Sequence, residues 1–206
     1  MDNPARTARY LATMEKRRVD LRALLAGTVP EGTRLVWEIG CGHGHFLTSY
    51  AQAHPGTFCF GIDIVAERIQ RALRKRDRAR LTNLHFTQAE ARLFLETLPA
   101  GAQFSAIFVL FPDPWPKVRH HKHRIMQADF LESSARRAAT DARLYFRTDY
   151  RPYFADVATI LDQRPGWQPV AESWPFEHET VFQSRAERYY SLVAKPFLPG
   201  AISSSA

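Results

Sequence analysis

A glycine-rich turn between a short apolar segment and an expected helix is the feature that most restricts the fold of this chain. The segment Leu35–Ile39 reads Leu-Val-Trp-Glu-Ile and runs directly into Gly40-Cys41-Gly42-His43-Gly44. A helix is expected to start near His45 and to end near Pro55. Glycine adopts positive φ and lets a backbone approach a ligand closely. A strand, a glycine turn and a helix in this order are therefore typical of a nucleotide-binding α/β domain.

An acidic residue follows at the spacing of a ribose-binding carboxylate. A second strand is predicted over Thr57–Ile62 and ends at Asp63, which comes 19 residues after Gly44. In folds that bind nucleotides this way, the acid that contacts the ribose lies about 20 residues further on. Two such elements in register are a stronger signal than a glycine motif alone, although a packing turn with an incidental acid downstream is the alternative.

The glycine spacing favours one class of nucleotide over another. A dinucleotide fingerprint, G-x-G-x-x-G, would place its third glycine at position 45, where this chain has His45. The turn instead reads G-x-G-x-G, with the acidic Glu38 just before it. S-adenosylmethionine has no pyrophosphate and carries a cationic sulfonium and an amino-acid group, so an acid beside the loop favours this methyl donor over NAD.

Strands and helices alternate through the rest of the chain, which predicts an α/β fold with a Rossmann-like doubly wound sheet, mostly parallel with an antiparallel last strand. Helices are expected over 65–80, 92–97, 127–139 and 153–163; further strands over 83–87, 104–110 and 143–146, with a last pair over 168–172 and 188–194. The expected organisation is a basic helical extension (1–33), one main domain (34–196) and a flexible tail (197–206).

The stretch from Phe111 to Arg124 carries the most unusual chemistry. It holds one carboxylate, Asp113, between two prolines and beside Trp115, and then a run with four Lys/Arg and three His and no acid. Proline fixes φ and pushes the residue before it to extended geometry, so Phe111, Asp113 and Trp115 are expected to be extended in a stiff loop. A stiff acid next to an aromatic plate and a cationic run suits a nucleobase joined to phosphates. A proline-rich turn followed by a solvated charge run is the alternative.

Composition and charge limit the kinds of partner and cofactor that the protein is expected to bind. The net charge of +7 and the pI of about 9.7 fit an anionic partner. The two cysteines, Cys41 and Cys59, have no metal or redox spacing, which fits a reducing cytoplasm. The histidine run lacks a carboxylate or cysteine at ligand spacing, so no metal is expected, and no apolar run is long enough to span a membrane. The strongly basic helix over 65–80 is interpreted as a solvated face.

Four motifs together resemble those of the tRNA (guanine-N7-)-methyltransferases. They are the segment Glu38–Gly44, the F-P-D-P-W-P-K stretch at 111–117 with its R-H-H-K run, Thr148-Asp149-Tyr150, and a T-x-F-x-x-R pattern at 180–185. The resemblance extends over roughly 35–195. The second motif is highly specific, whereas the glycine loop is shared by many methyltransferases.

The resemblance implies a class I S-adenosylmethionine-dependent methyltransferase that acts on N7 of a guanosine at position 46 in the variable loop of tRNA. It implies a cytoplasmic enzyme, a monomer or a homodimer, with no metal and no membrane partner. The donor site would comprise Glu38, Gly40, Gly42, Gly44, Asp63, Glu90 and Asp113, with Asp113 also the catalytic candidate. Substrate contacts would fall on Lys117, Asp149, Thr180, Val181, Phe182 and Gln183, and RNA contacts on Arg119, His120, His121, Lys122, His123 and Arg124.

Some positions depart from the family pattern, and two other functions stay open. Cys41 replaces an aromatic residue, Glu90 stands where aspartate is usual, and Gln183 and Ala186 are substituted in the T-x-F-E-x-R-G pattern. Because Asp113-Pro114-Trp115 is similar to the N/D-P-P-Y/F motif, a methyltransferase acting on an exocyclic amino group of a nucleobase is one alternative. A catalytically silent RNA-binding module on the same fold is another.

Overall fold

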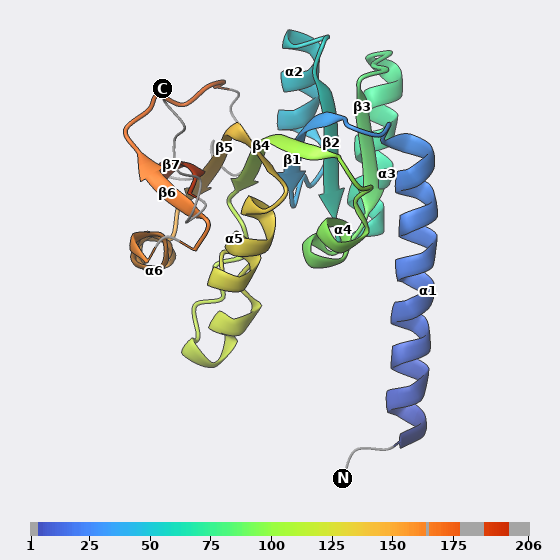
Figure 1. Ribbon diagram of the computed structural model, residues 1–206, viewed down its shortest axis with the longest axis horizontal. Coiled ribbons are helices and arrows are strands. Elements are labelled where there is room, and N and C mark those ends of the chain that lie inside the picture. The colour runs from blue at the N-terminus through green and yellow to red at the C-terminus, as the bar shows by residue number, and fades with distance from the viewer. Residues whose placement is uncertain (1–3, 164, 178–187, 198–206) are drawn as a thin grey trace, which may run out of the picture.

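The computed structural model describes residues 4–163, 165–177 and 188–197, which form a seven-stranded sheet flanked by helices (Figure 1). The strand order is β3-β2-β1-β4-β5-β7-β6. β7 is antiparallel to both of its neighbours, β5 and β6, and the other pairs are parallel, which confirms the predicted sheet. The strands are β1 Arg34–Ile39, β2 Phe58–Asp63, β3 Leu84–Gln88, β4 Gln103–Leu110, β5 Ala138–Thr148, β6 Trp167–Val170 and β7 Tyr190–Pro196.

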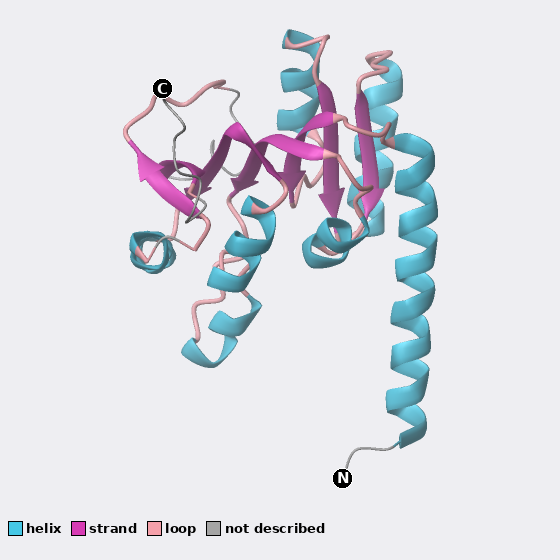
Figure 2. Cartoon of the chain, viewed as in Figure 1, coloured by secondary structure: helices cyan, strands magenta, loops and turns pink. Residues whose placement is uncertain are grey.

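Helices cover both faces of the sheet (Figure 2). Their bounds are α1 Pro4–Thr28, α2 His45–Ala53, α3 Ala66–Arg78, α4 Ala91–Thr97, α5 Ala128–Ala135 and α6 Arg151–Asp162, with a 3-10 helix, η1, over Val118–His123. One hydrophobic core joins the sheet to α1, α4, α5 and α6, and a second core joins it to α2 and α3.

β1 shows why its sequence is apolar at successive positions. Leu35 and Trp37 face the first core and Val36 faces the second, as expected for a central parallel strand buried on both sides. Trp37 stacks between Phe94 and Phe104, with ring centroids 5.0 and 4.8 Å apart. The chain order reverses between β1 and β4, so the loops after these neighbouring strands meet at the carboxyl edge of the sheet, where open α/β folds bind ligands.

α1 is anchored by its C-terminal half. Leu21, Leu25 and, just after the helix, Val29 are buried, whereas Tyr10 and Leu11 are 61% and 60% exposed. Its N-terminal half extends past the carboxyl edge of the sheet, on the opposite flank from the segment 111–127 (Figure 1). Within the described ranges, no helix is long and apolar enough to cross a membrane.

One helix prediction was too long. The helix expected over 127–139 ends at Ala135, and β5 begins at Ala138 rather than at Arg143. The reason is pairing with β4: Phe104 donates its backbone N–H to the carbonyl of Arg137 (2.8 Å) and lies opposite Ala138. Strand pairing here overrides the helix propensity of the two alanines that follow Arg137.

Candidate active site

The glycine turn lies open at the carboxyl end of β1. Gly40, Gly42 and Gly44 have φ values of 70°, 54° and 67°, which side-chain-bearing residues rarely adopt. A Cβ at Gly44 would lie 2.7 Å from Cζ of Phe86, so packing requires glycine there. A Cβ at Gly40 or Gly42 would meet no atom within 4 Å, so this backbone has open space around it for a ligand.

Glu38 is a buried acid beneath this turn. Glu38 as a whole is only 4% exposed, and its carboxylate oxygen Oε2 has no hydrogen-bond partner among the described residues. Burial raises the pKa of Glu38 to about 8; the backbone N–H of Leu47, in the first turn of α2, acts against that rise, and the charge of Asp63 adds to it. An unpartnered, buried carboxylate oxygen beside an open glycine turn is a suitable place for a cationic group of a ligand.

Asp63 holds the turn in place from the end of β2. Its Oδ2 accepts a hydrogen bond from the N–H of Gly42 (3.0 Å), and its Oδ1 accepts one from Val65 (2.8 Å). Arg68 approaches Oδ2 at 3.5 Å. The structure thus brings Asp63 and the glycine turn together, as the spacing predicted, while its contact with a ribose stays a prediction.

Glu90 lies on the rim of the same edge, exposed, at the N-terminus of α4. Glu90 is the N-cap residue of α4, but its carboxylate makes no capping hydrogen bond. Its Oε1 lies 3.8 Å from Nη1 of Arg17, which belongs to α1.

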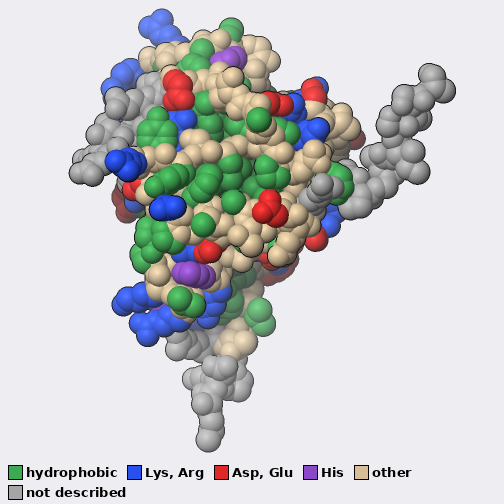
Figure 3. Space-filling view, turned by 90° about the vertical axis from the view of Figure 1, so that its left-hand side faces the viewer, with side chains coloured by type: hydrophobic (Ala, Val, Ile, Leu, Met, Phe, Trp, Pro, Cys, Tyr) green, Lys and Arg blue, Asp and Glu red, His purple; other side chains and the backbone are tan. Residues whose placement is uncertain are grey.

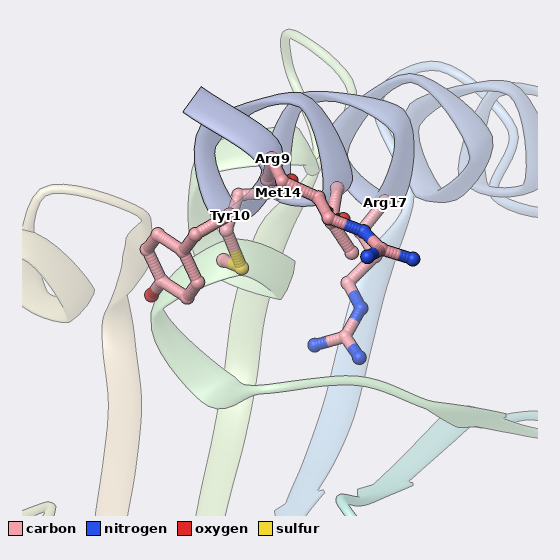
Figure 4. Close-up of a pocket in the computed structure, with 5 residues that line it drawn as sticks. Arg9, Tyr10, Met14 and Arg17 are labelled. Atoms are coloured by element: carbon pink, nitrogen blue, oxygen red, sulfur yellow. Dashed lines mark hydrogen bonds between the residues drawn. The ribbon is translucent and has the colours of Figure 1, made fainter. Parts of the chain in front are cut away.

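Sequence reasoning did not find a pocket at α1. Arg9, Tyr10, Thr13, Met14 and Arg17 line it (Figure 4). Tyr10, Met14 and Arg17 are spaced four and three residues apart, so they lie on one face of the helix. This spacing is the sequence pattern from which a shared surface at α1 could have been predicted.

The loop around Asp113 is not extended throughout. Phe111 and Trp115 have φ values of 49° and 44°, so the expectation of extended geometry before proline is wrong at both positions. Such φ values are strained for bulky residues and persist only where the surroundings impose them. At Phe111, the backbone N–H is held by the carbonyl of Arg147 at 2.7 Å. Asp113 itself is exposed at this edge of the sheet.

Arg124 explains the strain at Trp115. It is buried at 4% exposure, and its guanidinium donates to the carbonyls of Pro114 (2.8 Å) and Trp115 (3.4 Å). It also pairs with Asp156 and stacks over the ring of Tyr153, with its Cζ 4.6 Å from the centroid. The residue predicted to contact RNA is thus placed inside the protein, where it ties the Asp113 loop to α6.

Replacing Arg124 by methionine should destabilise the protein. The change leaves two carbonyls and a carboxylate without their charged donor, which typically costs about 1.5–3 kcal/mol. For a chain of this size that corresponds to a fall in melting temperature of about 3–12 °C. Calorimetric melting of Arg124→Met is compared with that of Arg119→Met, an exposed arginine nearby. Equal melting temperatures for the two variants would contradict the structural role.

The rest of the cationic run is accessible. Arg119, Lys122 and His123 on η1 are exposed, as is the preceding Lys117, while His120 and His121 are half-buried. Lys, Arg and His side chains gather in the lower part of the face in Figure 3, the level at which Figure 1 places this segment. His120 and His123 form ring contacts with Trp115, at centroid distances of 5.8 and 5.1 Å. The described residues contain no group of three or more potential metal ligands.

Asp149 is exposed just after β5, at the same edge as Asp113. The other predicted substrate contacts, Thr180, Val181, Phe182 and Gln183, lie outside the described residues.

Arg147, two residues before Asp149, was missed by sequence reasoning. It is buried, and its guanidinium donates two hydrogen bonds to the carboxylate of Glu177, with N–O distances of 2.9 and 3.0 Å. Its Cζ also lies 3.9 Å from the ring centroid of Trp174 and 4.6 Å from that of Tyr189. No local pattern signalled these contacts, because the partners come from distant segments.

Comparisons with known proteins agree with this geometry. A family model with the description "Putative methyltransferase" matches residues 33–190. The chain is 34% identical over 179 residues to a tRNA (guanine-N(7)-)-methyltransferase of Chromohalobacter salexigens, covering 83% of this chain and 71% of that one. It is 32% identical over 177 residues to the protein of that name from Nitrosomonas europaea, covering 80% and 77%.

Solved structures agree on the fold. A precorrin-6y C5,15-methyltransferase from Geobacter metallireducens superposes with a TM-score of 0.57 at 14% identity, covering 87% of this chain and 86% of that one. TrmN from Thermus thermophilus superposes with a TM-score of 0.58 at 18% identity, covering 87% and 49%. Fold, glycine turn and sequence similarity agree, and the chain belongs to the tRNA (guanine-N(7)-)-methyltransferase family.

Proposed function

We propose that this protein transfers a methyl group from S-adenosylmethionine to N7 of a guanosine in tRNA, at position 46 of the variable loop. One observation carries the proposal: the unpartnered buried carboxylate of Glu38 lies at the end of β1, and the exposed carboxylate of Asp113 follows the neighbouring strand β4. Ile39 at the end of β1 lies opposite Val109 of β4, so the glycine turn and the Asp113 loop leave the sheet side by side. Family membership supports the choice of tRNA and of guanine N7.

The residues present fit the donor. The orphan oxygen of Glu38 would bind the amino group of the donor, and the open backbone at Gly40 and Gly42 would lie against it. Asp63 would accept from the ribose hydroxyls and Glu90 from the adenine amino group. When bound, S-adenosylmethionine supplies a methyl group on a sulfonium, which a nucleophile can displace in line.

Guanine N7 needs no general base. Its lone pair lies in the plane of the ring and carries no proton, so the protein has to position the base and exclude water. The N7–CH₃ bond forms as the CH₃–S bond breaks, and the guanine becomes cationic. The Asp113 carboxylate would stabilise this growing positive charge. Asp149 would accept from guanine N1–H or the 2-amino group, and Lys117 with the exposed η1 cations would hold phosphates.

A tritiated methyl-transfer assay on unmodified total tRNA, followed by nucleoside analysis, tests the proposal. The expected product is N7-methylguanosine, absent when position 46 of the tRNA is not guanosine. Methyl on an exocyclic nitrogen would favour the amino-group methyltransferase. RNA binding with no donor binding would favour the silent module. We further propose that the enzyme acts in the cytoplasm. We also propose that it is a monomer or a homodimer, and analytical sedimentation distinguishes these two oligomeric states.

A further inference from the structure

Helix α3 carries four exposed arginines on its solvent face. Ile69 and Ala72 face the second core, and successive helical residues are separated by about 100°. That rotation places the side chains opposite the core on one continuous surface, here called the α3 stripe, which consists of Arg68, Arg71, Arg74 and Arg78. Glu67 is the acid on this surface.

Among the described residues, three of the four stripe arginines have no acidic partner, and Arg68 alone pairs with an acid, Asp63. Arg71, Arg74 and Arg78 are exposed and make no salt bridge with any described residue. The other acid of the helix, Asp77, pairs with Arg76 at 2.6 Å instead. Cations near the end of a helix do stabilise its dipole, but that effect is confined to the last turn and does not account for Arg71 or Arg74. Unpaired charge of one sign along a helix is typical of a surface that attracts an anion.

The stripe begins at the proposed donor site. Arg68 lies 3.5 Å from Asp63, the acid that holds the glycine turn. In that turn, burial lowers the pKa of His43, and the charges of Arg71, Arg68 and Lys75 lower it further, so these cations lie close to the turn. From Arg68 to Arg78 the helix rises about 15 Å, a distance that spans several phosphates of a nucleic acid.

We propose that the α3 stripe binds the phosphate backbone of the tRNA substrate, away from the target base. α3 packs on the second core, whereas Arg124 ties the η1 loop to α6 on the first. The stripe is thus a second electrostatic contact, separate from the η1 cations. The identity of the RNA as tRNA rests on the proposed function. The proposal also gives a binding role to a helix surface that the sequence alone had indicated to be a solvated face.

The test removes three charges and keeps the folded core. Arg71→Gln/Arg74→Gln/Arg78→Gln spares Lys75, whose Nζ is buried, and Arg68, which touches Asp63. Binding to unmodified tRNA without donor is measured against salt concentration. If each arginine neutralises one phosphate, the slope of log K against log salt should become less steep by about two to three. The KM for tRNA should rise, while kcat at saturating tRNA and donor affinity stay unchanged.

Two matched variants complete the test. Arg22→Gln/Arg34→Gln/Arg136→Gln removes the same charge at exposed positions off α3, and it should keep nearly the wild-type slope. The lysine version of the α3 triple variant keeps the charge and should also keep the slope, which separates electrostatics from folding. A wild-type slope in the glutamine variant, or an equal loss in the Arg22 control set, would overturn the proposal. Because binding is measured without donor, a wild type that binds tRNA but transfers no methyl rejects the proposed function alone.

Discussion

Asp113→Asn is expected to lower kcat about 10²–10³-fold while tRNA affinity changes little. The substitution keeps the shape and one acceptor oxygen of the side chain but removes its charge. If the carboxylate stabilises the positive charge that develops on guanine, its effect appears in the transition state rather than in binding. Losing one well-placed electrostatic partner typically costs that much in rate.

The measurement is a single-turnover methyl transfer with both substrates saturating. Donor affinity is measured by calorimetry on the same variant, because Asp113 is also a donor-site candidate. Asp162→Asn, an exposed aspartate at the end of α6, is the matched control and should react at the wild-type rate. If Asp113→Asn also reacted at the wild-type rate, Asp113 would be a turn residue and Asp149 would become the better candidate.

Sequence could predict the parts of this fold that follow local rules. The strands around the glycine turn are apolar at most positions, because a central parallel strand is buried on both faces. Alternation of such strands with helices implies crossover connections, and these leave few possible topologies. Asp63 and the glycine turn could be placed together because the ends of neighbouring parallel strands meet at one edge, and the hydrogen bond from Gly42 to Asp63 is the outcome.

The features that the sequence did not predict depend on contacts between segments that are distant in the chain. Arg124 looked like one cation in a basic run, and only the fold shows Asp156 and Tyr153 beside it. The positive φ of Trp115 contradicts a sound local rule, because the guanidinium of Arg124 holds the carbonyl groups around it. Arg147 likewise has no local pattern.

Glu38→Gln is expected to separate stability from donor binding. In the donor-free protein the pKa of Glu38 is raised to about 8 from an ordinary value of 4.5, chiefly by burial. Between these values the folded state keeps a proton that the unfolded state has released, so the contribution of Glu38 to stability falls as the pH rises. Glutamine carries no titrating proton. The variant should therefore lose this part of the pH dependence and be more stable than the wild type near pH 8, as measured by denaturant unfolding over pH.

The same substitution should weaken donor binding about 10–100-fold, because a hydrogen bond between two charged groups is worth about 1.5–3 kcal/mol and a neutral amide cannot replace it. In the wild type, donor affinity should rise as the pH rises towards the pKa of Glu38, since binding a cation requires the ionised carboxylate. Glu132→Gln, at an exposed glutamate on α5, is the control and should change neither property. A variant that gained stability at high pH yet bound the donor as tightly as the wild type would show that Glu38 is a buried acid without a ligand. Loss of donor affinity together with the gain in stability would show instead that the protein tolerates an unpartnered buried carboxylate because the donor requires it.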